Sequence, residues 1–142
     1  MTIKTRKEVR EHLGSLLSSA LVGTGKPAQA VYDYLKSSFD GQSPVVVIGS
    51  SGFNAQEQDF TNWFATYDYE VLVFVAREDT QLADDYLDQT TQKLYETLQT
   101  NRVLSGYWDD LVWADPSQIV PAVVGGKPYW METVLVRVTV YE

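Results

Sequence analysis

The chain has 142 residues, 44% of them hydrophobic and 21% charged, which predicts one soluble globular domain spanning residues 1–142. It contains no cysteine, which excludes disulfides, thiolate metal sites and a cysteine nucleophile. The net charge of −8 repels phosphate and argues against sequence-reading DNA binding. No apolar run approaches the roughly 20 residues of a membrane helix, and no apolar stretch follows the basic N-terminus, so neither a membrane span nor a secretory signal is expected.

The first predicted element is a helix that begins at Thr5. Thr5 and Glu8 have the spacing of a capping box, in which each side chain accepts a hydrogen bond from the other residue's free N–H group. Apolar residues then recur at helical spacing in one stripe, which comprises Val9, Leu13, Leu16, Leu17, Ala20 and Leu21. Gly23, Gly25 and Pro27 end the helix, because glycine tolerates a left-handed cap and proline cannot continue the hydrogen-bond ladder.

Two strands are predicted next. Residues 28–35 form a short tyrosine-rich strand, and residues 39–43 have the composition of a turn. Pro44 then opens a strand over residues 45–48, which is apolar on both faces and is therefore expected inside a covered sheet. The Gly-Ser-Ser-Gly run at 49–52 breaks this strand. It lacks the lysine and the following helix of a phosphate-binding loop, so a turn is the better interpretation.

Residues 53–66 show no periodicity and are predicted to form a long loop. Four large apolar residues lie in this segment, namely Phe53, Phe60, Trp63 and Phe64. A loop of this length in a compact domain is usually functional or disordered, and the aromatic residues argue against disorder. The four rings either pack under the loop as a separate cluster or anchor a partner, because aromatic residues are enriched at interface hot spots.

Residues 67–76 give the clearest strand. Its first half alternates apolar and acidic residues, and its second half is apolar throughout, so one end should be half-solvated and the other covered on both faces. A second helix is predicted from about Thr80 to Thr100. Its apolar face comprises Leu87, Thr91, Leu94 and Leu98.

The chain ends in two predicted strands, at residues 107–114 and 129–141. A Gly-Gly-Lys-Pro turn at 125–128 precedes the last strand, whose valines at 134, 136, 138 and 140 share one face. The predicted order is α-β-β-β-α-β-β. Consecutive strands joined by short turns favour antiparallel pairing. The fold class is therefore α+β, with a mainly antiparallel sheet of about five strands and two helices packed on one face.

The sequence shows no catalytic constellation. His12 is the only histidine, and on the first helix it has no recognisable partner to orient it as a base. Asp84, Asp85 and Asp88 resemble a diphosphate-binding motif of prenyl synthases, but those enzymes are longer, all-helical and carry a second such motif. The aspartates are better interpreted as a solvated helix start, where the helix dipole favours negative charge. We therefore expect no catalytic, metal or cofactor residue, and no enzymatic activity.

The layout of these elements resembles a known family of assembly proteins. An N-terminal amphipathic helix is followed by "AVYDYL", by the buried strand "PVVVIGSSG" and by the aromatic segment. The alternating strand "YDYEVLVFVARE", a helix ending in "LYETLQTNRVL" and the strand "METVLVRVTVYE" complete the pattern. The chain is similar over nearly its whole length to the tail terminator, or tail completion, proteins of long-tailed bacteriophages. The likeness is one of element order and not of a residue signature.

The resemblance implies a structural role in virion assembly. Members of that family form a ring, usually of six subunits, at the head-proximal end of the tail tube. The ring ends polymerisation of the tube protein and presents a docking surface to the head connector, while DNA passes through the lumen without sequence-specific binding. The resemblance further implies no cofactor, synthesis in the cytoplasm of the host bacterium and residence in the virion.

Three other functions stay open at this level. The chain could be another neck, head-closure or tube protein of a phage. It could be a small ligand-binding α+β domain in which residues 53–66 form a lid. The least favoured is a metal-dependent enzyme that uses the aspartates.

Overall fold

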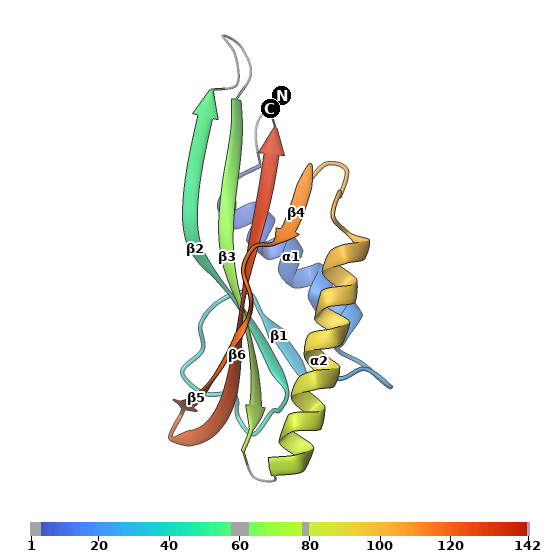
Figure 1. Ribbon diagram of the computed structural model, residues 1–142, viewed down its shortest axis with the longest axis vertical. Helices are drawn as coiled ribbons and strands as arrows, with labels where there is room; N and C mark the ends of the chain where they lie inside the picture. The colour runs from blue at the N-terminus through green and yellow to red at the C-terminus, as the bar shows by residue number, and fades with distance from the viewer. Residues whose placement is uncertain (1–3, 58–62, 78–79, 142) are drawn as a thin grey trace.

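The computed structural model describes residues 4–57, 63–77 and 80–141, which contain two helices and six strands. The helices are α1 (Arg6–Leu21) and α2 (Thr80–Thr100). The strands are β1 (Ala30–Tyr32), β2 (Val45–Glu57), β3 (Trp63–Ala76), β4 (Asp110–Trp113), β5 (Gln118–Val124) and β6 (Lys127–Tyr141). Figure 1 shows β2, β3 and β6 as long, nearly vertical strands beside the helices. The predicted α+β class is confirmed.

The strands form one sheet in the order β1-β2-β3-β6-β4, and β5 pairs with β6 beyond β4 along the same edge. All neighbouring pairs are antiparallel except β1–β2, which is parallel and joins Ala30 to Val45. The sheet is therefore mainly antiparallel, as predicted, and the parallel β1–β2 pair is the exception. Residues 33–44 are long enough to return the chain to the start of β1, as a parallel crossover requires.

Both helices pack on one face of the sheet and form the main core with it. This core contains the apolar stripe of α1, the face of α2 that carries Leu94 and Leu98, and the four alternating valines of β6. The valines are Val134, Val136, Val138 and Val140, and all four are buried. The predicted faces of α1, α2 and β6 are therefore confirmed, as is the capping box of Thr5 and Glu8.

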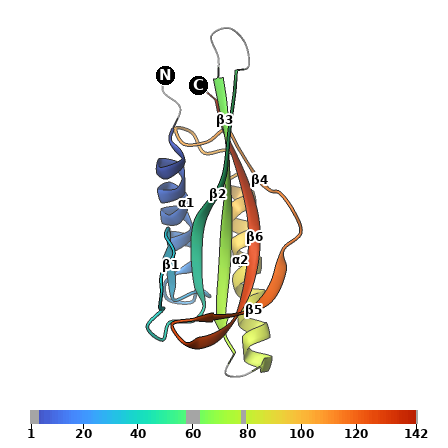
Figure 2. The same cartoon turned by 90° about the vertical axis from the view of Figure 1, so that its left-hand side faces the viewer.

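A smaller core lies on the opposite face, at the lower end of the sheet. Phe39 packs there against Phe74 at 4.9 Å and against Tyr129 at 5.5 Å between ring centroids. The segment before β2 and the hairpin of β5 with β6 lie over this end of the sheet, as Figure 2 shows. Val45 and Val47 are buried in the same cluster. The second half of β3 and the first half of β2 are thus covered on both faces, as predicted.

Two strands are shorter than predicted, and a further strand was not predicted. The tyrosine-rich strand is only Ala30–Tyr32, and the strand predicted at 107–114 is only Asp110–Trp113. β4 starts late because residues 104–108 form a turn, in which the Leu104 N–H donates to the carbonyl of Trp108 at 3.1 Å. The Trp108 indole also donates to the carbonyl of Asn101. No element was predicted where β5 lies, because its mostly exposed side chains and central proline hide the alternation typical of a strand.

We expect Leu94→Ala to destabilise the fold strongly. Leu94 is fully buried between α2 and the sheet, so its truncation should lower the free energy of unfolding by about 2–5 kcal/mol. Urea denaturation of this variant and of Lys93→Ala, an exposed neighbour on the same helix, measures the difference. An unchanged urea midpoint for Leu94→Ala would contradict the packing.

Candidate interaction surface on the distal hairpin

Residues 53–66 do not form the predicted loop. β2 continues to Glu57 and β3 already begins at Trp63, so most of the segment is an antiparallel hairpin with Phe53 opposite Tyr67. We name residues 50–57 and 63–69 the distal hairpin. In Figure 1 it rises past the upper ends of both helices. Phe60, one of the four predicted interface residues, lies outside the residues that the structure describes.

A β-bulge determines which way Phe53 points. Ser50 is opposite Tyr69 and Gly52 is opposite Asp68, so Ser51 is an extra residue in β2. The extra residue inverts the alternation and places Phe53 on the face that the helices cover further down the sheet. Gly52 fits beside Asp68, where a Cβ atom would lie 3.2 Å from the carboxylate.

The structure does not gather the predicted aromatic residues into one cluster. Phe53 and Trp63 lie on the helix-covered face of the sheet, with exposed fractions of 60% and 44%. Phe64 lies on the other face, where its ring is 5.7 Å from that of Tyr141. Phe53 itself has Tyr67 as a ring neighbour at 5.4 Å. The surface is therefore a strand with aromatic side chains on both faces and not a hydrophobic pocket.

The outer edge of β2 is open along most of its length. β1 pairs only with Val45–Val47, and no strand in the described part of the chain pairs with this edge from Ile48 to Glu57. β2 contains no lysine and no proline, and Glu57 is its only ionisable residue. Edge strands are commonly protected by such residues or by a bulge, and β2 has only the bulge. Its unpaired backbone groups can accept another strand.

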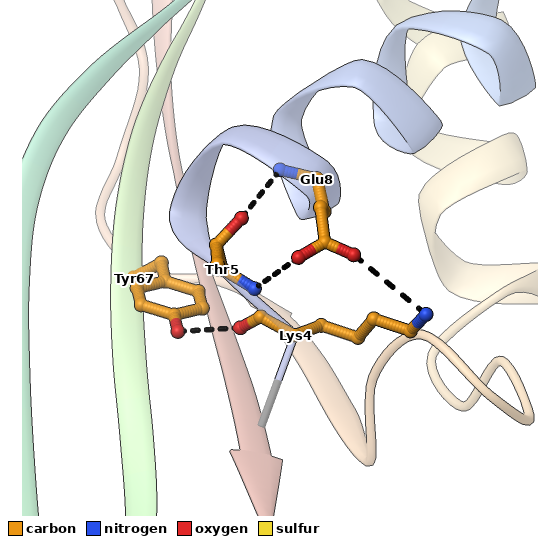
Figure 3. A network of polar contacts seen from close by, with 4 residues as sticks. All are labelled: Lys4, Thr5, Glu8 and Tyr67. Carbon is orange, nitrogen blue, oxygen red and sulfur yellow. Dashed lines mark hydrogen bonds and ion pairs between the residues drawn. The ribbon is translucent and has the colours of Figure 1, made fainter. Parts of the chain in front are cut away.

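Tyrosine hydroxyls attach the start of α1 to the base of the distal hairpin. Figure 3 shows the Tyr67 hydroxyl donating to the carbonyl of Lys4 at 2.6 Å. The capping box lies directly beside it, with the Thr5 N–H donating to Glu8 and the Glu8 N–H donating to the Thr5 hydroxyl. Tyr69 donates in the same way to the carbonyl of Arg6 at 2.8 Å. These bonds fix the direction of α1 relative to β3.

The local environment shifts the pKa values of the groups in this network. Hydrogen bonds from the Thr5 backbone and side chain hold the pKa of Glu8 below its usual value. Burial raises the pKa of Tyr67, and the negative charge of Glu8 raises it further. Burial also raises the pKa of Tyr69, with a smaller contribution from Tyr67. Both phenols therefore stay protonated and keep donating well above neutral pH.

The opposite face of the distal hairpin carries an ion pair in addition to Phe64. Arg137 on β6 contacts Asp68 on β3 through two hydrogen bonds of 2.8 and 3.3 Å. The bond to Asp68 raises the pKa of the Arg137 guanidinium. This exposed pair fixes the side chains of β3 and β6 in register, but an exposed ion pair contributes little to the stability of the fold.

The histidine and the aspartates considered in the sequence analysis lie away from the distal hairpin. His12 is half-buried and stacks on Tyr107 with ring centroids 3.5 Å apart, and burial lowers its pKa. Asp84, Asp85 and Asp88 are exposed on the first turns of α2. Within residues 4–57, 63–77 and 80–141, no three His, Asp or Glu side chains are grouped to hold a metal ion.

Sequence reasoning missed the open edge of β2 and the role of Tyr67 beside Phe53. One signal was available. The two glycines at 49 and 52 flank the bulge, and isolated glycines in a strand pattern indicate a bulge. Restarting the alternation after Gly52 would have placed Phe53 and Ala55 on one face and extended the strand.

We expect the tyrosine bonds to make stability fall at high pH. Because the pKa of Tyr69 is higher in the folded than in the unfolded state, its contribution is fully present below about pH 10 and is lost as the pH rises toward its folded value. Tyr69→Phe should lower the free energy of unfolding by about 0.5–1.5 kcal/mol at pH 7 and weaken the alkaline decline. The exposed Tyr34→Phe is the control, and denaturation from pH 7 to 11 is the measurement. An equally steep decline in Tyr69→Phe and the native chain would contradict the assignment.

Comparison with known proteins does not identify the chain. No protein-family model matches it, and no curated protein matches it. In the part of the chain that the structure describes, neither helix is long and apolar enough to cross a membrane. A functional assignment therefore depends on the geometry of the distal hairpin and on the resemblance in element order.

Proposed function

We propose that the chain is a structural assembly subunit that ends a phage tail tube by forming a ring on it. The observation that carries this proposal is the distal hairpin, where Phe53 and Trp63 are exposed beside an unpaired strand edge. A surface of this kind supports association between chains. The α+β fold and the order of its elements are compatible with the resemblance to tail terminators, which supplies the ring and its place on the tube.

The exposed aromatic residues favour association on energetic grounds. Large apolar rings that stay in water are an aggregation hazard, and burial at an interface removes it. Aromatic residues at the centre of an interface commonly contribute 2 kcal/mol or more to binding. An unpaired strand edge adds backbone hydrogen bonds, which give affinity without demanding a particular side-chain sequence.

The proposed partners follow from the same role. Six copies of the chain form the ring, one side of the ring contacts the tube protein, and the other contacts the head connector. The net charge of −8 suits a lumen through which DNA slides without being retained. In this proposal the chain binds no cofactor, catalyses no reaction and resides at the head-proximal end of the tail.

A ligand-binding domain with a lid is a weaker proposal. In that hypothesis residues 53–66 form the lid. Residues 53–57 and 63–66 are instead paired strands that continue the sheet. A wide groove lies elsewhere, between α1 and α2, and is lined mainly by polar side chains such as Ser19, Gln92 and Thr100. In the described part of the distal hairpin, the depression beside Asp68 and Arg137 is lined mainly by polar side chains.

We expect Trp63→Ala to weaken self-association while leaving the fold of the single chain nearly unchanged. Trp63 is 44% exposed, so its truncation removes less packing within the chain than the loss of a buried tryptophan and also removes an anchor between chains. Sedimentation and thermal melting at several concentrations measure the two effects separately. Trp108→Ala is the matched control, because Trp108 is buried and its loss should lower the melting temperature.

Electron microscopy and mass measurement of the native chain test the ring directly, and a closed ring of six subunits is expected. A chain that stays monomeric at every concentration would contradict the proposal. If Trp63→Ala forms an intact oligomer and its melting temperature falls sharply, Trp63 packs within its own chain and does not belong to the interface.

A further inference from the structure

The sheet has two open edges at the same height. Phe53 on β2 is opposite Tyr67, and Tyr67 is opposite Val138 on β6. Leu111 on β4 is opposite the same Val138. Phe53 and Leu111 therefore lie in one row across the sheet, at its two edges. The open part of β2 and the whole of β4 occupy the same level of the molecule.

The two edges also run in compatible directions. β2, β3, β6 and β4 are each antiparallel to the next strand, so β4 runs antiparallel to β2. If a second copy stands beside the first in the same orientation, it presents its β4 antiparallel to β2 of the first. Antiparallel pairs are the commoner kind and tolerate an exposed face. The sheet can then continue from one copy to the next.

A groove beside β4 can receive the Phe53 ring. It has a volume of about 250 Å³ and lies between α2 and β4, where Leu98, Leu111 and Trp113 contribute apolar surface. An apolar cavity of about 150 Å³ already accommodates benzene, so the groove has room for a phenyl ring. Three consecutive residues of β4, 111–113, line it, so the groove runs alongside this edge strand.

Phe53 points toward the correct face for this groove. The bulge at Ser51 places it on the helix-covered face, the face on which α2 and Leu111 lie. Without the extra residue, Phe53 would project from the opposite face beside Asp68 and Arg137 instead. The bulge thus places the Phe53 ring on the helix-covered face, in the same row as Leu111. The groove beside β4 lies on that face at the opposite edge of the sheet.

The charges of the helices complement each other across the two edges. α1 packs on β1 and β2, and α2 packs on β3 and β4. α1 carries three basic and two acidic side chains, whereas α2 carries one basic and four acidic side chains. Placing β2 of one copy beside β4 of the next brings the basic helix close to the acidic one. Such complementarity orients the partners and speeds their association.

We propose that the open edge of β2 pairs with the open edge of β4 in a second copy of this chain, and that Phe53 inserts into the groove between α2 and β4 of that copy. The contact joins two different surfaces, so it repeats and generates a closed ring or a filament. This inference rests on the proposed self-assembly and names the surfaces that mediate it. A symmetric β2–β2 dimer and the addition of a strand from another protein are the alternatives that the experiments exclude.

The first experiment compares Phe53→Ser with Val123→Ser. Both side chains are exposed apolar residues in strands, but Val123 is on β5 at the other end of the sheet. We expect Phe53→Ser to raise the dissociation constant of self-association at least about tenfold, and Val123→Ser to leave it unchanged. Sedimentation velocity measures the constant, and monomer melting temperatures check that both variants fold. Equal association by the two variants would overturn the role of Phe53.

The second experiment uses the absence of cysteine in the chain. Asn54→Cys marks β2, and Val112→Cys marks β4 on the same face of the sheet. A short bismaleimide should cross-link a mixture of the two single-cysteine variants and leave each variant alone uncross-linked. A covalent dimer of Asn54→Cys alone would indicate a β2–β2 contact and overturn the inference.

The remaining outcomes separate this inference from the proposed function. Rings that form normally but give no cross-link in the mixture would overturn the β2–β4 contact and leave the assembly role standing. A chain that stays monomeric up to about 1 mM, a limit of roughly 4 kcal/mol of binding free energy, would overturn both. Association that weakens as the salt concentration rises is expected, and association insensitive to salt would overturn the contribution of the helices.

Discussion

The three long strands β2, β3 and β6 are longer than the helices that cover them, and the exposed surfaces follow from that mismatch. A helix rises about 1.5 Å per residue and a strand about 3.3 Å. α1 has 16 residues and α2 has 21, whereas β3 has 14 and β6 has 15. The helices therefore span roughly 24 and 32 Å and the strands roughly 46 and 50 Å. The helical layer cannot cover both ends of the sheet, and at the upper end of the distal hairpin Phe53 and Trp63 remain exposed, whereas Tyr67 and Tyr69 are buried.

The two ends of the sheet differ in how the residues beyond the helices are covered. At the lower end the face opposite the helices is closed within the chain, because Phe39, Phe74 and Tyr129 pack together under the segment before β2 and the hairpin of β5 with β6. At the upper end the same face carries the Asp68–Arg137 pair, and the helix-covered face carries exposed rings. The lower end is completed by the chain itself. At the upper end the chain itself leaves Phe53 and Trp63 exposed.

Sequence reasoning predicted the parts of the fold in which periodicity and burial coincide. In α1, α2 and β6 the apolar residues recur at a constant period on one face. The pattern alone was therefore sufficient to predict these elements and the faces that they bury. It missed β5, whose side chains are mostly exposed, and the distal hairpin, where Ser51 interrupts the period. It also missed the open edge of β2, because an edge is a property of strand order, and the parallel β1–β2 pair depends on a crossover that no local pattern encodes.

The hydrogen bonds of Tyr67 and Tyr69 connect the stability of the fold to the geometry of association. They hold the first turn of α1 against β3, so the basic residues of α1 keep a constant position relative to the edge of β2. A strand edge alone gives affinity but little selectivity, since any extended chain can pair with it. A fixed charge beside the edge adds selectivity, because a wrongly oriented partner would place like charges together. In the proposed contact, the edge, the Phe53 ring and the charge of α1 are presented side by side, and a partner has to complement all three.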